Sequence, residues 1–303
     1  MNDLLSINQL KKNEINSIVE KAIQLKALGE KNKRNKLDNL VVASLFFEPS
    51  TRTRLSFESA ILLAGGHYID MGDVNNTSLA KGEDFYDTIR MVEAYSHIII
   101  IRHSESGAAS KAADIANIPV INAGDGENEH PTQALQDIMT IYENCGDITT
   151  LSIGIIGDLK YGRAVHSFVY ALIKLKVKKI VFIASNGLYI PEKIKKMLFL
   201  AKIPFEECDD LQVELSNLDL LYVTRIQKER FEKNDYKTTS FYEVSTDILK
   251  KNPNIKIMHP FPRVDELSRK FDSYPNALYF QQAKNGVYIR QILLELLYKG
   301  GEI

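Results

Sequence analysis

The sequence predicts an α/β protein with two doubly wound domains, each a mostly parallel sheet with helices on both faces. Short apolar runs alternate with segments of helical period, which is typical of strands joined by helical crossovers. One such series runs to residue 122 and a second begins at Leu151, and 303 residues are enough for two domains of ordinary size. The strands are expected at 40–47, 67–71, 97–102, 118–122, 151–156, 180–184, 218–223 and 256–259.

Composition and charge exclude several classes of protein. Apolar residues make up 45% and charged residues 25% of the chain, and the net charge is −1, so no basic field argues for nucleic acid or an anionic membrane as a partner. No apolar run is long enough to span a bilayer, and the polar N-terminus argues against a secretory signal. The two cysteines, Cys145 and Cys208, lack metal-ligand spacing, which favours a reducing, cytoplasmic setting and no metal site.

The most informative stretch is 46–60, which reads FFEPSTRTRLSFESA. Pro49 ends the preceding strand in a turn and an apolar stripe of helical period follows, so we expect strand, tight turn and helix. Three hydroxyls, on Ser50, Thr51 and Thr53, stand where side chains cap a helix. With two arginines and the unpaired N–H groups of the helix start, they form a cradle for an anion, most simply a phosphate. The alternative is a capped helix with surface arginines, and the Walker spacing is absent.

Polar residues also follow other expected strands. His130 and Gln133 flank the start of a helix opened by Pro131, after a glycine-rich turn at the end of a strand. A histidine at such a place is explained as well by a hydrogen bond to backbone as by a function. The turn Gly157–Arg163 resembles a nucleotide-binding loop, but its glycines lack the G-x-G-x-x-G spacing, so we do not expect a dinucleotide ligand.

Arginines recur just past the ends of expected strands in both halves of the chain, at Arg52, Arg102, Arg163 and Arg225. Any one of them alone is best explained as a surface residue. Parallel sheets bind ligands at the carboxyl ends of their strands, so four arginines at equivalent positions predict an active site for a polyanion in a cleft between the two sheets. A guanidinium at the start of a helix, as at Arg163, suits a carboxylate.

Several motifs together resemble the transcarbamoylase family, which comprises the aspartate and ornithine carbamoyltransferases, over essentially the whole chain. The first, Ser50-Thr51-Arg52-Thr53-Arg54, is similar to the carbamoyl-phosphate motif of the family. The others are Arg102-His103, Gly124-Asp125-Gly126 with His130-Pro131-Thr132-Gln133, Gly157–Arg163, Thr224–Arg230 and His259–Arg263. Ornithine enzymes typically carry His-Cys-Leu-Pro at the last motif, whereas Pro260 follows His259 here. The pattern is therefore similar to that of aspartate carbamoyltransferase catalytic chains.

The resemblance implies transfer of a carbamoyl group from carbamoyl phosphate to the α-amine of L-aspartate, an early step of pyrimidine biosynthesis. The residues implied to hold the phosphate are Ser50, Thr51, Arg52 and Thr53. Those implied to bind the carbamoyl group are Thr53, Arg102 and His130 at the carbonyl oxygen and Gln133 at the amide. Those implied to bind the aspartate carboxylates are Arg163, Arg225 and Gln227. The catalytic set by the same resemblance is Arg52, Thr53, Lys81, Arg102 and His130.

The resemblance also implies active sites shared between the subunits of a homotrimer. Ser78 and Lys81 would reach into the site of a neighbouring subunit, where Lys81 would contact both substrates. The loop around Lys81 is one residue shorter than the form common in the family, which has two lysines. Lys81 is therefore assigned as the lysine that reaches into the neighbouring site. Members of the family occur both as bare trimers and in larger assemblies with regulatory chains.

The backbone at Pro260 and Phe261 is implied to position the carbamoyl group and the attacking amine. The family often has leucine at the position of Phe261, and the larger ring could alter closure of the site. The implied domains are a carbamoyl-phosphate-binding domain, 1–131 plus 285–303, and an aspartate-binding domain, 132–284. No cofactor is implied.

The implied mechanism needs no side-chain base. The deprotonated amine attacks the carbamoyl carbon, charge develops on the carbonyl oxygen, and the departing phosphate takes the proton, so His130 is expected to be a neutral donor. The alternatives are a carbamoyltransferase for another amine, such as ornithine, and a non-catalytic homologue that binds carbamoyl phosphate. Arg163 and Arg225 favour a dicarboxylate, and every mapped catalytic position holds a competent residue.

Overall fold

The computed structural model describes residues 2–29, 36–73, 76–185, 187–231 and 243–300. The chain forms two compact units, unit 1 (Met1–Met139 with Lys284–Ile303) and unit 2 (Thr140–Ala283). The sequence-based boundaries lie after residues 131 and 284, and helix α5 (Pro131–Asn144) runs continuously across the first boundary between the units.

Unit 1 is built on a parallel sheet of four strands in the order β2-β1-β3-β4. The strands are β1 (Val41–Phe46), β2 (His67–Asp70), β3 (Ile98–His103) and β4 (Val120–Asp125). Successive residues of a strand point to opposite faces, so Ile98 and Ile100 belong to one hydrophobic core while Ile99 and Ile101 belong to another. Burial on both faces explains why this strand is an unbroken run of isoleucines.

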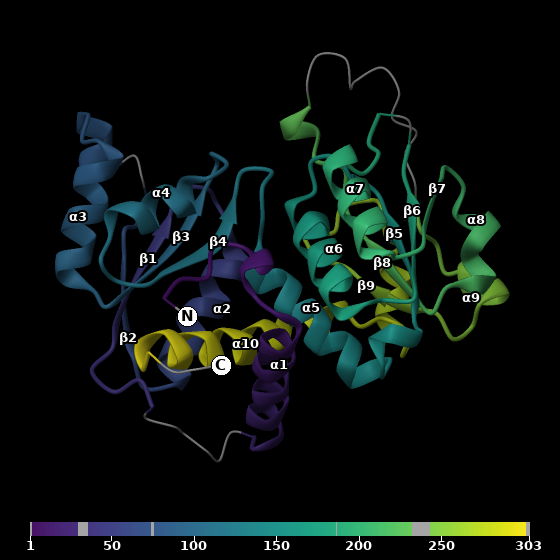
Figure 1. The fold of residues 1–303 in the computed structure, drawn as a ribbon, viewed down its shortest axis with the longest axis horizontal. Helices are drawn as coiled ribbons and strands as arrows, with labels where there is room; N and C mark the ends of the chain where they lie inside the picture. The colour runs from purple at the N-terminus through teal and green to yellow at the C-terminus, as the bar shows by residue number, and fades with distance from the viewer. Residues whose placement is uncertain (1, 30–35, 74–75, 186, 232–242, 301–303) are drawn as a thin grey trace. The chain divides into compact units, whose positions relative to one another are not determined.

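Helices cover both faces of this sheet, as Figure 1 shows. Besides α5, they are α1 (Lys12–Ala27), α2 (Thr51–Leu63), α3 (Phe85–Tyr95), α4 (Ala108–Ile115) and α10 (Tyr279–Tyr298). α2 and α10 pack on one face through residues such as Phe57 and Leu294, and α3 and α4 pack on the other. α1 lies beside α10, where Lys26 Nζ donates to Asn285 Oδ1 at 2.9 Å. The C-terminal helix therefore completes the core of unit 1.

Unit 2 is built on a parallel sheet of five strands in the order β7-β6-β5-β8-β9. The strands are β5 (Ser152–Ile156), β6 (Lys179–Ile183), β7 (Phe205–Cys208), β8 (Leu220–Val223) and β9 (Lys256–Met258). The helices are α6 (Arg163–Leu175), α7 (Glu192–Ala201), α8 (Leu211–Glu214) and α9 (Ile248–Lys251). Phe168 of α6 stacks on Tyr222 of β8 on one face, and Leu211 of α8 and Ile248 of α9 pack on the other. The predicted fold class, two doubly wound α/β domains, is confirmed.

Two local expectations are wrong. The sequence pattern gave no strand at β7, because this edge strand pairs on one side only and carries the polar pair Glu206 and Glu207. The hydroxyl of Ser50 was expected to cap α2; Ser50 is the N-cap residue, with φ −160°, but its side chain makes no capping hydrogen bond. The first-turn N–H groups of α2 are therefore not satisfied by that hydroxyl.

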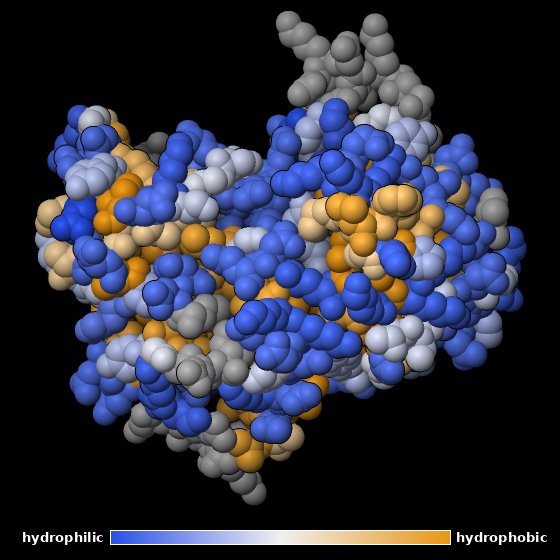
Figure 2. Space-filling view, viewed as in Figure 1, coloured by the Kyte–Doolittle hydropathy of each residue, from blue (hydrophilic) through white to orange (hydrophobic). Residues whose placement is uncertain are grey.

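The surface is largely hydrophilic on the face drawn in Figure 2, with hydrophobic residues gathered over α7. Near the end of that helix, Phe199 and Leu200 are 77% and 69% exposed. Among the residues that the structure describes, no helix combines the length and apolar character needed to cross a bilayer.

Candidate active site

The first group of predicted site residues lies at the carboxyl edge of the unit 1 sheet, where the strand order reverses. β2 lies on one side of β1 and β3 on the other, which makes the ends of β1 and β3 a topological switch point. The two ends are in register, because Phe46 is opposite Arg102 and Phe47 N donates to Arg102 O at 2.9 Å. The loop that leads from β1 to α2 therefore starts opposite Arg102.

The residues that were predicted to form an anion cradle lie at the start of α2. Thr51 and Arg52 are exposed, whereas Thr53 is buried. Arg54 points elsewhere, since its Nε donates to Glu58 Oε1 at 2.9 Å and its guanidinium pairs with Asp70. Of the two arginines in the motif, Arg54 is thus turned toward Glu58 and Asp70, and Arg52 is exposed in the first turn of the helix.

Arg102 is held between neighbouring strand ends. Its Nη1 donates to Ala123 O at the end of β4 at 3.3 Å, and its Nη2 lies 3.3 Å from Glu48 Oε2 in the loop after β1. The side chain is only 12% exposed. The guanidinium is thus held in a defined position at this edge of the sheet.

The loop between β4 and α5 is fixed by two buried carboxylates. Asp125 accepts from Asn122 Nδ2 at 2.8 Å and from Gly107 N at 2.7 Å, and Glu129 Oε2 accepts from Ile7 N at 2.9 Å. These bonds tie the loop to two other segments, at Gly107 and at Ile7. The loop therefore delivers the start of α5 to the same edge of the sheet in a defined position.

His130 and Gln133 lie at the start of α5 and are both buried. Thr132 Oγ1 lies 3.5 Å from His130 Nδ1 and accepts from Arg290 Nη2 at 3.4 Å. Arg290, from α10, is fully buried over the ring of Phe57, at 4.8 Å from its centroid, and burial lowers the pKa of its guanidinium to about 9. Neither motif nor spacing in the sequence indicated that Arg290 lies behind the site.

Ser78 and Lys81 lie in a separate element of unit 1. They form the short 3-10 helix η3 (Ser78–Lys81), where both are exposed. Ser78 lines a groove together with Ile69, Met91 and other residues of β2 and α3. The structure thus brings Arg52, Arg102, His130 and Gln133 to the strand ends and leaves Ser78 and Lys81 on the outer surface.

The second group of predicted residues lies at the carboxyl edge of the unit 2 sheet, again where the strand order reverses. The reversal is between β5 and β8, whose ends approach closely. Gly157 has φ +123°, and a Cβ there would lie 2.0 Å from Thr224 O, so only glycine fits. Asp158 joins the two loops, since it accepts from Tyr161 N at 2.9 Å and from Gln227 N at 3.0 Å. Burial raises the pKa of this carboxyl, although these backbone bonds oppose the shift.

Three predicted residues follow these two strands. Arg163 is the first residue of α6 and is buried, and Arg225 and Gln227 follow β8 and are partly exposed. The Arg225 guanidinium pairs with Glu229, and this hydrogen bond lowers the pKa of the Glu229 carboxyl. Arg225 is therefore placed to exchange this partner for a carboxylate of a ligand.

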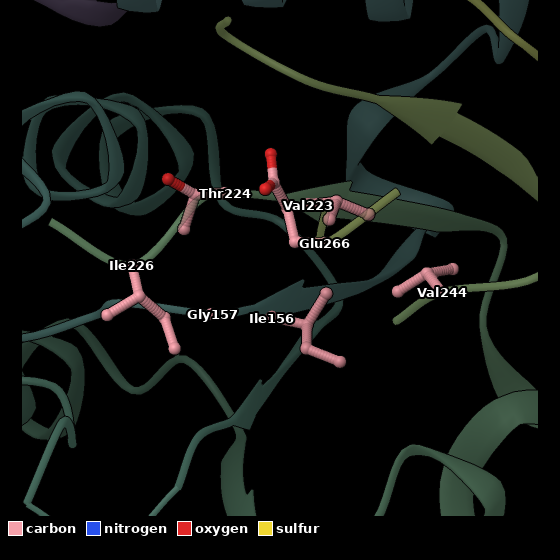
Figure 3. Close-up of a pocket in the computed structure, with 7 residues that line it drawn as sticks. All are labelled: Ile156, Gly157, Val223, Thr224, Ile226, Val244 and Glu266. Carbon is pink, nitrogen blue, oxygen red and sulfur yellow. The ribbon is translucent and has the colours of Figure 1, made fainter. Parts of the chain in front are cut away.

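A small cavity lies beneath the same strand ends (Figure 3). Thr224 and Glu266 supply its polar side chains, and Ile156, Val223 and Val244 are among the apolar residues. Its volume of about 10 Å³ leaves room for no more than a single water molecule. An amino-acid substrate must therefore bind outside it.

The loop after β9 is held by a buried histidine. His259 Nδ1 accepts from Phe261 N at 2.8 Å, which leaves Nε2 to donate to Glu266 Oε1 at 2.6 Å. Glu266 also accepts from Val264 N. The backbone at Pro260 and Phe261 is thereby fixed at the end of a strand that neighbours β8.

Two family models match successive parts of the chain. The carbamoyl-P binding domain of aspartate/ornithine carbamoyltransferase matches residues 2–143, and the Asp/Orn binding domain of the same enzymes matches residues 149–297. The chain belongs to the aspartate/ornithine carbamoyltransferase family. Its relatives include the aspartate carbamoyltransferase catalytic subunit of Vibrio vulnificus, 46% identical over 298 residues that cover 97% of this chain and 96% of that one. The corresponding subunit of Wigglesworthia glossinidia brevipalpis is 45% identical over 295 residues, which cover 96% and 94% of the two chains.

Solved structures of this family are similar over the whole chain. The catalytic subunit of M. jannaschii aspartate transcarbamoylase has a TM-score of 0.90 and 41% identity, with 99% of both chains covered. The aspartate transcarbamoylase from Trypanosoma cruzi, in complex with carbamoyl phosphate and aspartate, has a TM-score of 0.92 and 31% identity, with 97% of this chain and 96% of that one covered.

One departure from the carbamoyltransferase pattern has a structural explanation. The ring of Phe261 packs against His259, Tyr279 and Phe280, with centroid distances of 5.6, 5.6 and 5.7 Å. The additional bulk is thus accommodated within unit 2, against the start of α10. A backbone role for Phe261 is compatible with this packing.

The histidine, cysteine and carboxylate side chains form no candidate metal site in the part of the chain that the structure describes. Within the described ranges, no group of three or more histidine, cysteine, aspartate or glutamate side chains could hold a metal ion. Cys145 and Cys208 are both free thiols, and burial raises the pKa of Cys145 to about 11.

Proposed function

We propose that the chain is the catalytic chain of an aspartate carbamoyltransferase, acting in pyrimidine biosynthesis. It transfers the carbamoyl group of carbamoyl phosphate to L-aspartate: the amine nitrogen forms a bond to the carbamoyl carbon, and the bond from that carbon to the phosphate oxygen breaks. The names of the relatives and the ligands named with the Trypanosoma cruzi structure support this reaction. The products are N-carbamoyl-L-aspartate and phosphate.

The observation that carries the proposal is the pairing of β1 with β3, because the loop that leads into α2 starts opposite Arg102. In this proposal the phosphate binds to Ser50, Thr51, Arg52 and Thr53, where the helix start offers backbone N–H groups and positive potential. The hydroxyl of Ser50 makes no capping hydrogen bond to α2, which supports its assignment to the phosphate. Arg52 stabilises the phosphate as it leaves.

Charge that develops on the carbamoyl oxygen is met by Thr53, Arg102 and His130 in this proposal. Thr132 Oγ1 accepts from Arg290, and its own hydrogen is available to His130 Nδ1, 3.5 Å away. That arrangement supports a neutral imidazole with its proton on Nε2, which donates to the oxyanion and does not act as a base. Loss of one such donor typically costs about 3 kcal/mol in the barrier.

The aspartate is bound in unit 2 by Arg163, Arg225 and Gln227 in this proposal, with the backbone at Pro260 and Phe261 orienting the amine. Two guanidiniums suit the two carboxylates of aspartate better than the second amine of ornithine. The bonds that fix Gln227 N and the loop after β9 support a preorganised subsite.

We further propose a homotrimer in which Ser78 and Lys81 complete the site of a neighbouring subunit. Their exposure on the outer surface of unit 1 supports this assignment. Residues 1–131 with 285–303 are assigned to the carbamoyl-phosphate domain and residues 132–284 to the aspartate domain. Gln133, which lies just past this border but within unit 1, is assigned to the carbamoyl amide. The two free thiols support a reducing, cytoplasmic setting, and binding of a regulatory chain is compatible with the family.

The test is product formation from carbamoyl phosphate with aspartate and ornithine offered in parallel. We expect carbamoyl-aspartate and phosphate, and loss of turnover in Arg52→Ala. Arg54→Ala is the matched control, because that guanidinium pairs with Glu58 and Asp70, and it should retain activity. Turnover with ornithine alone would contradict the assignment of Arg163 and Arg225, and binding without turnover of either amine would favour the non-catalytic alternative.

A further inference from the structure

A buried carboxylate lies one helical turn behind Gln133. Asp137 of α5 has no exposed surface, and Gln133 Nε2 donates to its Oδ1 at 2.8 Å. Residues four apart on a helix face the same side, so the carboxylate lies directly behind the glutamine side chain. Gln133 itself is only 6% exposed, which leaves its amide little freedom to turn.

The chemistry of the pair decides which end of the Gln133 amide faces outward. An ionised carboxylate accepts hydrogen bonds and donates none, so only the NH₂ end of the amide can face Asp137. The carbonyl oxygen Oε1 is then directed away from Asp137. We propose that Asp137 is a positioning residue that makes Gln133 an acceptor toward its ligand and so selects a carbamoyl NH₂ group.

The negative charge of Asp137 is compensated within the same unit. Arg290 is fully buried and donates to Gln136 Oε1 at 3.0 Å and to Thr132 Oγ1 at 3.4 Å. Burial lowers the pKa of its guanidinium, and the negative charge of Asp137 offsets part of that decrease. An apolar pair of similar volume would generally be buried at less cost than two charges. What the carboxylate adds is the fixed orientation of Gln133.

This inference rests on the proposed function, in which Gln133 binds the carbamoyl amide. Acetyl phosphate has the same shape as carbamoyl phosphate but carries a methyl group in place of NH₂. A fixed acceptor in Gln133 is satisfied by the NH₂ group and left unpaired by the methyl group. We therefore expect the wild-type protein to prefer carbamoyl phosphate roughly ten- to hundredfold.

The test compares dissociation constants of carbamoyl phosphate, acetyl phosphate and inorganic phosphate for the full-length protein and for Asp137→Asn. The substituted amide has the shape of the carboxylate but can turn either end to Gln133, which releases the orientation. We expect the preference for carbamoyl over acetyl phosphate to fall about tenfold while the affinity for inorganic phosphate stays unchanged. Asp114→Asn, on the exposed side of α4, is the matched control and should behave as wild type.

A double-mutant cycle shows whether the effect passes through Gln133. In Gln133→Ala the preference should already be lost, and adding Asp137→Asn should change nothing further. If Asp137→Asn does not fold, the double variant Asp137→Leu with Arg290→Met replaces the charge pair by apolar side chains. We expect the same fall in the preference for carbamoyl over acetyl phosphate in this variant.

Three results would overturn the inference. One is an unchanged preference in Asp137→Asn, and another is an equal loss of affinity for all three anions, which would indicate a purely structural role. The third is a wild-type protein that neither binds nor uses carbamoyl phosphate, and this result alone would overturn the proposed function as well.

Discussion

Substitution of Gly157 by alanine should lower the free energy of unfolding of unit 2, because of the backbone geometry at this residue. The residue has φ +123°, which costs an L-residue about 1–3 kcal/mol. The new Cβ would also lie 2.0 Å from Thr224 O, well below the 3.0 Å that real Cβ atoms respect. That oxygen belongs to backbone at the end of β8 and cannot swing aside, so the strand ends must part at a further cost of about 1–3 kcal/mol. We expect a total loss of roughly 2–6 kcal/mol.

The assay is urea unfolding of Gly157→Ala beside Gly146→Ala. Gly146 also lies in unit 2 and has φ +79°, but its added Cβ would meet no atom within 4 Å, so it measures the backbone strain alone, at about 1–2 kcal/mol. Gly157→Ala should also raise the KM for aspartate, because Arg225 and Gln227 follow the displaced strand end. Affinity for carbamoyl phosphate should not change. Equal stability of the two variants, or a loss confined to carbamoyl phosphate, would refute this reasoning.

Three further substitutions test buried polar groups. Asp158→Asn places an NH₂ group against one of the two backbone donors, so it should lower the free energy of thermal unfolding by about 1–3 kcal/mol. It should also raise the KM for aspartate, because Gln227 N loses its acceptor. An unchanged KM would argue against a role of Asp158 in positioning Gln227. Arg290→Met leaves a buried carboxylate uncompensated and should cost about 3–5 kcal/mol in urea unfolding, whereas wild-type stability would contradict the charge pairing. Burial raises the pKa of Glu266, but the hydrogen bond from His259 and the backbone bonds keep it below its ordinary value. The ionised Glu266 therefore stabilises the folded protein above about pH 4.3, and this stabilisation is lost as the pH falls through the lower native pKa. The difference in unfolding free energy between wild type and Glu266→Gln should shrink below about pH 4. A difference that stays constant from about pH 7 to about pH 3 would contradict the lowered pKa of Glu266.

The inner parallel strands, β1, β3, β5 and β8, were predictable because they are buried on both faces. The run 98–101 is continuous isoleucine, and its neighbours across the sheet are similarly apolar, so little else in the chain competes with a strand there. The arginines after the strands were predictable for a related reason, since ligand groups gather at the carboxyl edge of such sheets. By contrast β7 pairs on one side only and carries charge, which makes its sequence resemble a loop.

The residues behind the site were not predictable, because their partners are remote in the chain. Arg290 meets Thr132 across 158 positions, and Asp158 meets Gln227 across 69. One signal was present in the sequence: Asp137 lies among the apolar core positions of its helix, next to Ile138. A carboxylate at such a place needs a polar partner, but only the structure supplies its identity. The border between the units was hidden too, because it falls inside α5 without any turn.

The return of α10 to unit 1 has a consequence for the order in which the chain matures on the ribosome. Leu294 and Leu297 belong to the core between β1 and α2, so that core remains open to solvent when its strands have been translated. All of Thr140–Ala283 must be made before α10 emerges, which takes roughly 7–30 s at about 5–20 residues per second. The segment translated in the middle can therefore reach its native state first, while the N-terminal part waits for the last residues. A premature stop before residue 284 would leave the exposed sheet of unit 1 as a substrate for chaperones and proteases.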